Sequence, residues 1–123
     1  MTHNSEANVC VVRVRQGISR ITLRPSARIT EADGLRTREE LLALTGGSRG
    51  GVLLDITGVG SVSREAISVY SSAVTVSAFA ILGSTPVDRV IAHGLLGLPL
   101  PACPSEYFTD EAEALSWLQT VGD

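Results

Sequence analysis

The stretch from Val52 to Ile67 constrains the fold more than any other part of the chain. It begins as an apolar run that passes through Asp55, continues into the Gly/Ser loop Gly58–Ser63, and restarts with residues typical of a helix. A continuous apolar run is typical of a strand covered on both faces. A strand, a glycine-containing loop and a helix form the corner at which α/β proteins usually build their sites. The stretch therefore predicts an α/β fold with a candidate site at this corner.

Strand and helix patterns follow one another along the rest of the chain. Two strand-like runs around a Gln16-Gly17 turn predict an N-terminal β-hairpin. The predicted strands cover residues 9–15, 18–23, 51–57, 78–83 and 106–108, and the predicted helices cover residues 30–44, 63–74, 84–95 and 109–121. This order predicts a single α/β domain over residues 1–123, a mixed five-stranded sheet with about four helices. Residues 1–7 are polar and are expected to be disordered.

Local residue patterns add detail to two of these helices. The Ser84-Thr85-Pro86 segment predicts a helix start, because a proline in the first turn loses no hydrogen bond. Thr109 is expected to cap the last helix. The apolar positions that should face the core from the helix after Pro86 are Val87, Val90, Ile91 and Leu95.

Charge and cysteine content limit the functions open to this chain. The formal net charge is −3 and all ten basic residues are arginine, so no nucleic-acid partner is expected. The absence of lysine excludes a Gly-Lys-Ser/Thr phosphate loop and a lysine Schiff base. Cys10 and Cys103 match no metal-ligand spacing. Cys10 is expected to be buried in its strand as a small apolar residue.

Hydrophobic segment length and the N-terminal sequence predict a location. The apolar stretches Val74–Gly83 and Gly94–Ala102 are about half as long as a membrane span. No signal peptide is recognised before the first strand. The chain is therefore expected to be cytoplasmic, with no membrane span and with reduced cysteines.

Catalytic interpretations of the Gly/Ser loop fail on the sequence. The loop is similar to a dinucleotide fingerprint, but Ser63 takes the place of the third glycine and no acid ends the following strand. Ser63, His93 and Asp55 contain the groups of a hydrolase triad, yet no Gly-x-Ser-x-Gly elbow is present. Asp55 is better explained as an acid that holds the adjacent loop. No catalytic residue, metal site or cofactor is predicted, and the chain is expected not to be an enzyme.

The same stretch resembles the signature loop of STAS domains, the fold of bacterial anti-sigma-factor antagonists. That signature reads apolar-Leu-Asp-Leu-Ser-x-Val-x-x-Ile-Asp-Ser-Ser-Gly-Leu, and Leu54–Val59 matches its first half without a gap. Arg64 and Glu65 fall on the two serines, so the serine that such proteins phosphorylate is replaced. The element order and the ending Phe108–Leu118 also resemble small bacterial STAS-like proteins that share their fold with CRAL-TRIO lipid-transfer domains. The resemblance implies a STAS-like fold over nearly the whole chain.

This resemblance, without a catalytic constellation, implies a protein-interaction or regulatory module. The candidate interaction loop consists of Gly58, Gly60, Ser61, Ser63, Arg64 and Glu65. The expected partner is another protein, which includes a second copy of this chain, and modification of Ser61 or Ser63 is left open. The alternative function is binding of a small apolar or lipid-like ligand under the proline-containing segment Leu95–Pro104.

That proline-containing segment also supplies a candidate dimer or ligand surface. Its members are Leu95, Leu96, Leu98 and Leu100. The intervening glycine and prolines prevent all four leucines from lying on one face of a regular helix. A contiguous exposed apolar patch usually marks an association surface. Either the segment contributes to a homodimer interface, or it folds back and covers the end of the sheet.

Overall fold

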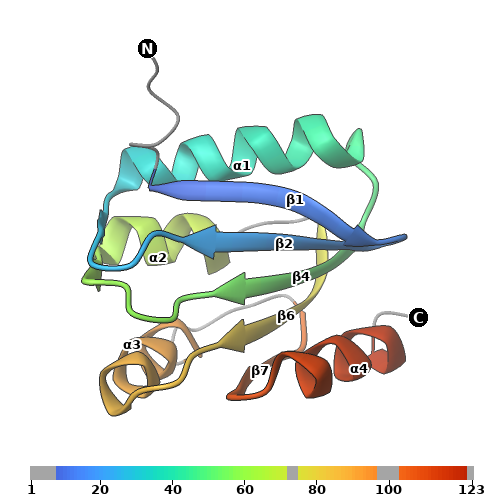
Figure 1. The fold of residues 1–123 in the computed structure, drawn as a ribbon. Coiled ribbons are helices and arrows are strands. Elements are labelled where there is room, and N and C mark those ends of the chain that lie inside the picture. The colour runs from blue at the N-terminus through green and yellow to red at the C-terminus, as the bar shows by residue number, and fades with distance from the viewer. Residues whose placement is uncertain (1–7, 72–74, 97–102, 122–123) are drawn as a thin grey trace.

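A five-stranded mixed sheet forms the centre of the computed structural model, which describes residues 8–71, 75–96 and 103–121 (Figure 1). Strands β1 (Val9–Arg15) and β2 (Ile18–Leu23) form an antiparallel hairpin. The sheet continues in parallel through β4 (Gly50–Asp55), β6 (Val76–Leu82) and β7 (Ser105–Phe108), in the order β1-β2-β4-β6-β7. The predicted mixed sheet with its N-terminal hairpin is confirmed.

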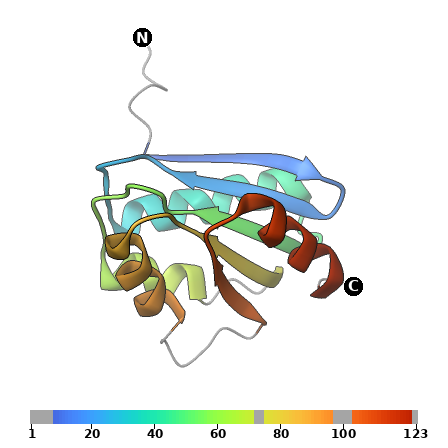
Figure 2. The ribbon, with the colours of Figure 1, turned by 60° about the horizontal axis from the view of Figure 1, so that its bottom comes forward.

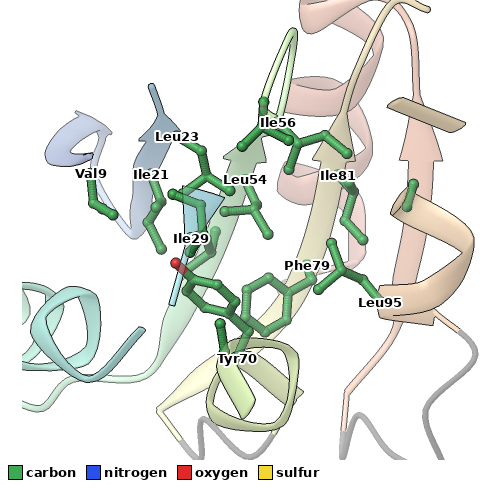
Figure 3. Close-up of a cluster of buried hydrophobic side chains, with 14 of the residues drawn as sticks. Val9, Ile21, Leu23, Ile29, Leu54, Ile56, Tyr70, Phe79, Ile81 and Leu95 are labelled. Atoms are coloured by element: carbon green, nitrogen blue, oxygen red, sulfur yellow. The ribbon is translucent and has the colours of Figure 1, made fainter. Parts of the chain in front are cut away.

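Helices cover the two faces of the sheet unequally (Figure 2). Helices α1 (Glu31–Thr45), α2 (Arg64–Ser71) and α3 (Pro86–Leu96) lie on one face, and α4 (Glu111–Val121) packs on the other against β4, β6 and β7. The larger core lies under the first three helices and includes Ile21, Leu54, Ile56, Tyr70 and Phe79 (Figure 3). The smaller core lies under α4 and includes Leu53, Ala80 and Leu118.

The coverage by α4 explains why one expectation about the first strand is wrong. Cys10 is exposed rather than buried, and Val12 on the same face of β1 keeps 44% of its surface exposed. Both side chains project from the α4 side of the sheet, where α4 reaches β4, β6 and β7. Alternation along a strand shows which residues share a face, and it does not show whether a helix covers that face.

Two short strands were not predicted. β3 (Arg28–Ile29) and β5 (Ser61–Val62) pair in parallel as a separate two-stranded sheet. Segments of two residues are too short for an apolar periodicity to identify. The pair fastens the loop that follows β4 to the segment that leads into α1.

Polar caps fix the helix boundaries. The side chain of Thr30 accepts from the Asp33 amide, and the Asp33 carboxylate accepts from the Thr30 amide at 2.9 Å, so α1 begins with a capping box. The expected cap of α4 is corrected by one residue. The Ala112 amide donates to the Asp110 carboxylate at 2.9 Å, and Asp110 rather than Thr109 caps that helix.

The sequence predicted no membrane span and a disordered N-terminal segment. In the part of the chain that the structure describes, no helix has both the length and the apolar character needed to cross a membrane. Residues 1–7, which were expected to be disordered, lie outside the described residues.

Candidate functional site

The candidate interaction loop lies at the end of the sheet where the parallel strands finish. The last residues of β4 and β6, Asp55 and Leu82, are register partners. Residues 56–63 lead from β4 to α2, and residues 83–85 lead from β6 to α3 (Figure 1). Both helices therefore begin beside the loop, at the carboxyl edge that α/β folds commonly use for sites.

Every backbone amide from Thr57 to Ser61 donates to an acceptor within the protein. The donor–acceptor residue pairs are Thr57–Asp55, Gly58–Asp88, Val59–Ile56, Gly60–Ala27 and Ser61–Ala27, with N···O distances of 3.0, 3.1, 3.0, 2.8 and 3.1 Å. A phosphate-binding loop needs several amides that point freely at its ligand. Here those amides are already used, so the loop is a fixed surface and not a cradle for phosphate.

Asp55 holds the loop, as expected, and also belongs to an ion network. One of its carboxylate oxygens accepts from the Thr57 amide, and the other contacts the Arg20 guanidinium at 2.5 Å. Arg20 also contacts the Glu111 carboxylate of α4 at 2.7 Å. Burial would lower the pKa of Arg20, but the two acids raise it above its ordinary value. The Arg20 guanidinium therefore joins the Asp55 end of β4 to α4.

The three residues of the rejected hydrolase triad are used separately. The hydroxyl of Ser63 accepts from the Ala66 amide at 3.1 Å and caps α2, whereas His93 is exposed on α3. The Asp55 carboxylate is occupied by Arg20 and the loop. None of these contacts joins the three residues to one another, which agrees with the absence of an elbow motif.

Asp88 is the one buried carboxylate in the described part of the chain, with 1% of its surface exposed. Its Oδ1 accepts from the Gly58 amide at 3.1 Å, and its Oδ2 accepts from the amides of Ser84 and Thr85 at 2.8 and 3.1 Å. Burial would raise the pKa of Asp88, but these amides hold it below the ordinary value. Asp88 is therefore charged at neutral pH and fixes the start of α3 to the loop after β4.

The buried carboxylate turns α3 away from its predicted orientation. Val87 and Val90 were expected to face the core, but 60% and 70% of their surfaces are exposed. The buried face instead carries Asp88, Ala92 and Leu95. These three positions recur at helical spacing, and the amides that bind Asp88 require this face to point inward.

The two exposed valines lie on the solvent side of α3, next to the position where this helix approaches α2. Val90 and Gly94 are one turn apart on the same face of the helix, and a Cβ added to Gly94 would lie 4.0 Å from the Ile67 side chain of α2. We define the α2–α3 surface by six exposed residues on the loop and the two helices, which are Gly60, Ser61, Arg64, Glu65, Val87 and Val90.

The other candidate residues have different environments. Ser61 is exposed, and its hydroxyl has no partner among the described residues, whereas Ser63 is half-buried and used as a cap. Leu95, expected on a dimer or ligand surface, is 7% exposed and belongs to the core (Figure 3). It follows Ala92 on the buried face of α3, which corrects that expectation. The Leu96 side chain, Leu98 and Leu100 lie outside the described residues.

The sequence contained a signal for Asp88 that the apolar pattern obscured. Thr85 and Asp88 have the three-residue spacing of a capping box, and the Asp88 amide donates to the Thr85 hydroxyl at 3.0 Å. The contact with Gly58 spans 30 positions in the chain. Local spacing could identify the cap, but not this long-range contact.

Comparisons with known proteins place the fold. The family model DUF7793, a domain of unknown function, matches residues 12–122. An uncharacterized protein of the DUF3478 family from Shewanella loihica PV-4, described as having a SpoIIAA-like fold, has a TM-score of 0.60 and 19% identity, over 89% of this chain and 91% of that one. A protein of unknown function from Arthrobacter sp. FB24 is 38% identical over 89% of this chain and 98% of that one, with a TM-score of 0.37. No curated protein matches. The Shewanella structure confirms the STAS-like, SpoIIAA-like fold.

Proposed function

The chain belongs to the DUF7793 family and has a SpoIIAA-like fold, and from this premise we propose that it is a non-enzymatic protein-interaction or regulatory module that acts through the α2–α3 surface. The observation that carries this proposal is the pair of exposed valines beside a loop whose amides are internally bonded. Apolar side chains on a fixed backbone lose little conformational freedom when a partner covers them.

The charges at the start of α2 support recognition without a phosphorylation switch. Arg64 and Glu65 stand where the resemblance places two serines, and both are exposed. A polar rim around apolar side chains is the usual composition of a protein interface. The proposed partner is therefore a protein with a complementary charged and apolar surface, and a second copy of this chain is included among the candidates.

A small apolar or lipid-like ligand is less well supported. The recess between α1 and α2 is lined mainly by apolar side chains that include Leu41, Val69 and Phe79, and its volume is about 120 Å³. Sites for small organic molecules usually measure about 300–1,000 Å³. The protein partner is therefore the interpretation that we favour.

Charge substitutions on the α2–α3 surface test the proposal. Val90→Glu and Arg64→Glu should each weaken partner binding by about tenfold or more, because they place a carboxylate in the apolar contact or reverse a rim charge. Both side chains are exposed, so the free energy of unfolding should change by less than about 0.5 kcal/mol. Affinity capture from the native host with the full chain, followed by titration of the purified partner, measures the effect.

Two matched substitutions serve as controls for that experiment. Val12→Glu and Arg24→Glu introduce the same changes at exposed residues of β1 and of the segment after β2. A genuine partner is retained by these controls and lost by the two surface variants. If the partner binds all five proteins equally, the α2–α3 surface is not its binding site. Sedimentation of the wild type shows whether that partner is a second copy.

A further inference from the structure

A cavity of about 280 Å³ lies at the opposite end of the sheet, where the parallel strands begin. It is partly open to solvent, and its lining residues come from the β1–β2 turn, the C-terminal half of α1 and the start of β4. These three segments lie at the same end of the sheet (Figure 1). Leu41, Ser19 and Val52 are buried around it, and Arg13 and Arg49 are exposed at its rim. The cavity is therefore separate from the α2–α3 surface.

The charge of the cavity is one-sided. Among the described residues, two arginines line it and no aspartate or glutamate does. Neither Arg13 nor Arg49 forms a salt bridge within the described part of the chain. The formal net charge of the whole chain is −3, whereas the charged residues that line this cavity are all positive. Two guanidinium groups without an acidic partner beside one cavity attract an oxyanion.

The C-terminus of α1 would by itself repel an anion, because its last carbonyls carry partial negative charge. Arg13 reduces this effect, since its guanidinium donates to the Leu44 carbonyl at 3.0 Å. The Leu42 carbonyl accepts from the Gly46 amide at 2.8 Å. Arg49 has no side-chain hydrogen bond among the described residues and is the arginine whose donors are free.

Ser19 supplies an independent observation. It is 5% exposed, it lines the cavity, and its hydroxyl has no hydrogen-bond partner within the described part of the chain. It is the register partner of Arg13 in β1 and of Val52 in β4. A hydroxyl both donates and accepts, so the Ser19 hydroxyl is available to a ligand oxygen in the cavity.

We propose that this cavity binds a small organic oxyanion, a carboxylate or a phosphate monoester. Arg49, Arg13 and the Ser19 hydroxyl hold the oxygens, and Leu41 and Val52 contact a short apolar body. The volume lies just below the usual range for small-molecule sites, which suits a compact ligand. Guanidinium groups bind carboxylates and phosphates in the same forked geometry. The cavity therefore indicates an oxyanion ligand, and an experiment must decide whether it is a carboxylate or a phosphate monoester.

Titration of the full ¹⁵N-labelled chain with three probes tests the proposal. The probes are inorganic phosphate, glycerol 3-phosphate and butyrate. We expect at least one organic anion to saturate with a Kd below about 1 mM and to shift the amides of Gly17, Ser19 and Gly51. Saturation by glycerol 3-phosphate identifies a phosphate site, and saturation by butyrate identifies a carboxylate site. Failure of all three probes to saturate would overturn the proposal.

Variants distinguish a site from general attraction to positive charge. Arg49→Gln should weaken binding about tenfold, whereas Arg24→Gln, which removes an exposed arginine elsewhere in the chain, should leave it unchanged. Ser19→Ala should weaken anion binding several-fold without lowering Tm in the absence of ligand, because it removes an unpaired hydroxyl. Equal loss of affinity in Arg49→Gln and Arg24→Gln, or unchanged affinity in Ser19→Ala with a lower Tm, contradicts the assignment.

Discussion

Replacing Asp88 by alanine is expected to lower the free energy of unfolding by about 3–5 kcal/mol. The change removes the acceptor of three amides, those of Gly58, Ser84 and Thr85. A buried N–H without an acceptor costs about 1–3 kcal/mol. Solvent cannot replace the lost acceptor here, because only 1% of the Asp88 surface is exposed. Urea unfolding of the two proteins, with equal slopes, measures the difference.

The control for this substitution is Asp110→Ala. Asp110 also caps a helix, but it is exposed, and its carboxylate accepts from the amide of Ala112. Loss of an exposed cap costs about 1 kcal/mol. An Asp88→Ala protein that is no less stable than Asp110→Ala would show that the buried carboxylate does not hold the loop and α3 together.

Acid should remove the contribution of Asp88 in a defined direction. Its folded-state pKa lies below the ordinary value of 3.8, so the stabilisation is complete above that value and is lost as the pH falls through the lower, folded-state pKa. Wild type should therefore exceed Asp88→Asn in stability by the full difference at neutral pH. The difference should shrink as the pH falls below the ordinary value of 3.8, and a difference independent of pH would contradict this explanation.

Replacing Gly60 by alanine is expected to lower the free energy of unfolding by about 2–4 kcal/mol. A Cβ at this position would lie 2.8 Å from the Ser26 carbonyl oxygen and 2.9 Å from that of Ala27. Both are backbone atoms, and the Ala27 oxygen also accepts the Gly60 amide at 2.8 Å. The loop must therefore move away from the segment that carries β3. Thermal or urea unfolding reports the loss.

Gly47→Ala provides the matched glycine control for Gly60→Ala. Gly47 has a φ of +87°, but a Cβ there meets no atom within 4 Å, so its cost is limited to about 1–2 kcal/mol of backbone strain. The two substitutions separate strain from collision. Gly60→Ala at wild-type stability would mean that the loop does not pack against residues 26 and 27 as described.

Much of the fold could be predicted because its elements carry strong local patterns. β1 and β2 were predicted with the same bounds as in the structure, since β-branched runs flank a glycine turn whose φ is +79°. Thr30 and Asp33 have the three-residue spacing of a capping box, and this local signal stands at the start of α1 in the structure. In these segments the residues that decide the conformation are neighbours in the sequence.

The orientation of α3 could not be predicted by the same rules. Apolar periodicity assumes that carboxylates face solvent and valines face the core, and here Asp88 is buried while Val90 is exposed. The carboxylate is stabilised by the Gly58 amide, which is 30 positions away. The pairing of β3 with β5 likewise depends on two segments that are distant in the chain. Such contacts follow from the tertiary fold and have no local signature.

The candidate loop was located correctly at a strand-to-helix corner, but its chemistry depends on the fold. Gly58 and Ser61 could equally have belonged to a loop with free amides for phosphate. The acceptors that occupy those amides are Asp88 and Ala27, which the sequence did not connect with the loop. The α2–α3 surface therefore depends on the position of α3 as well as on the glycines of the loop.

The proposed function requires the loop to be held in one conformation before any partner binds. Amide hydrogen exchange of Gly58, Gly60 and Ser61 in the free protein tests this requirement most directly. Because all three amides are internally bonded, they should exchange about a thousandfold or more slowly than unprotected peptide, and the protection of Gly58 should fall in Asp88→Asn. Exchange of these amides near the unprotected rate would contradict a preformed surface.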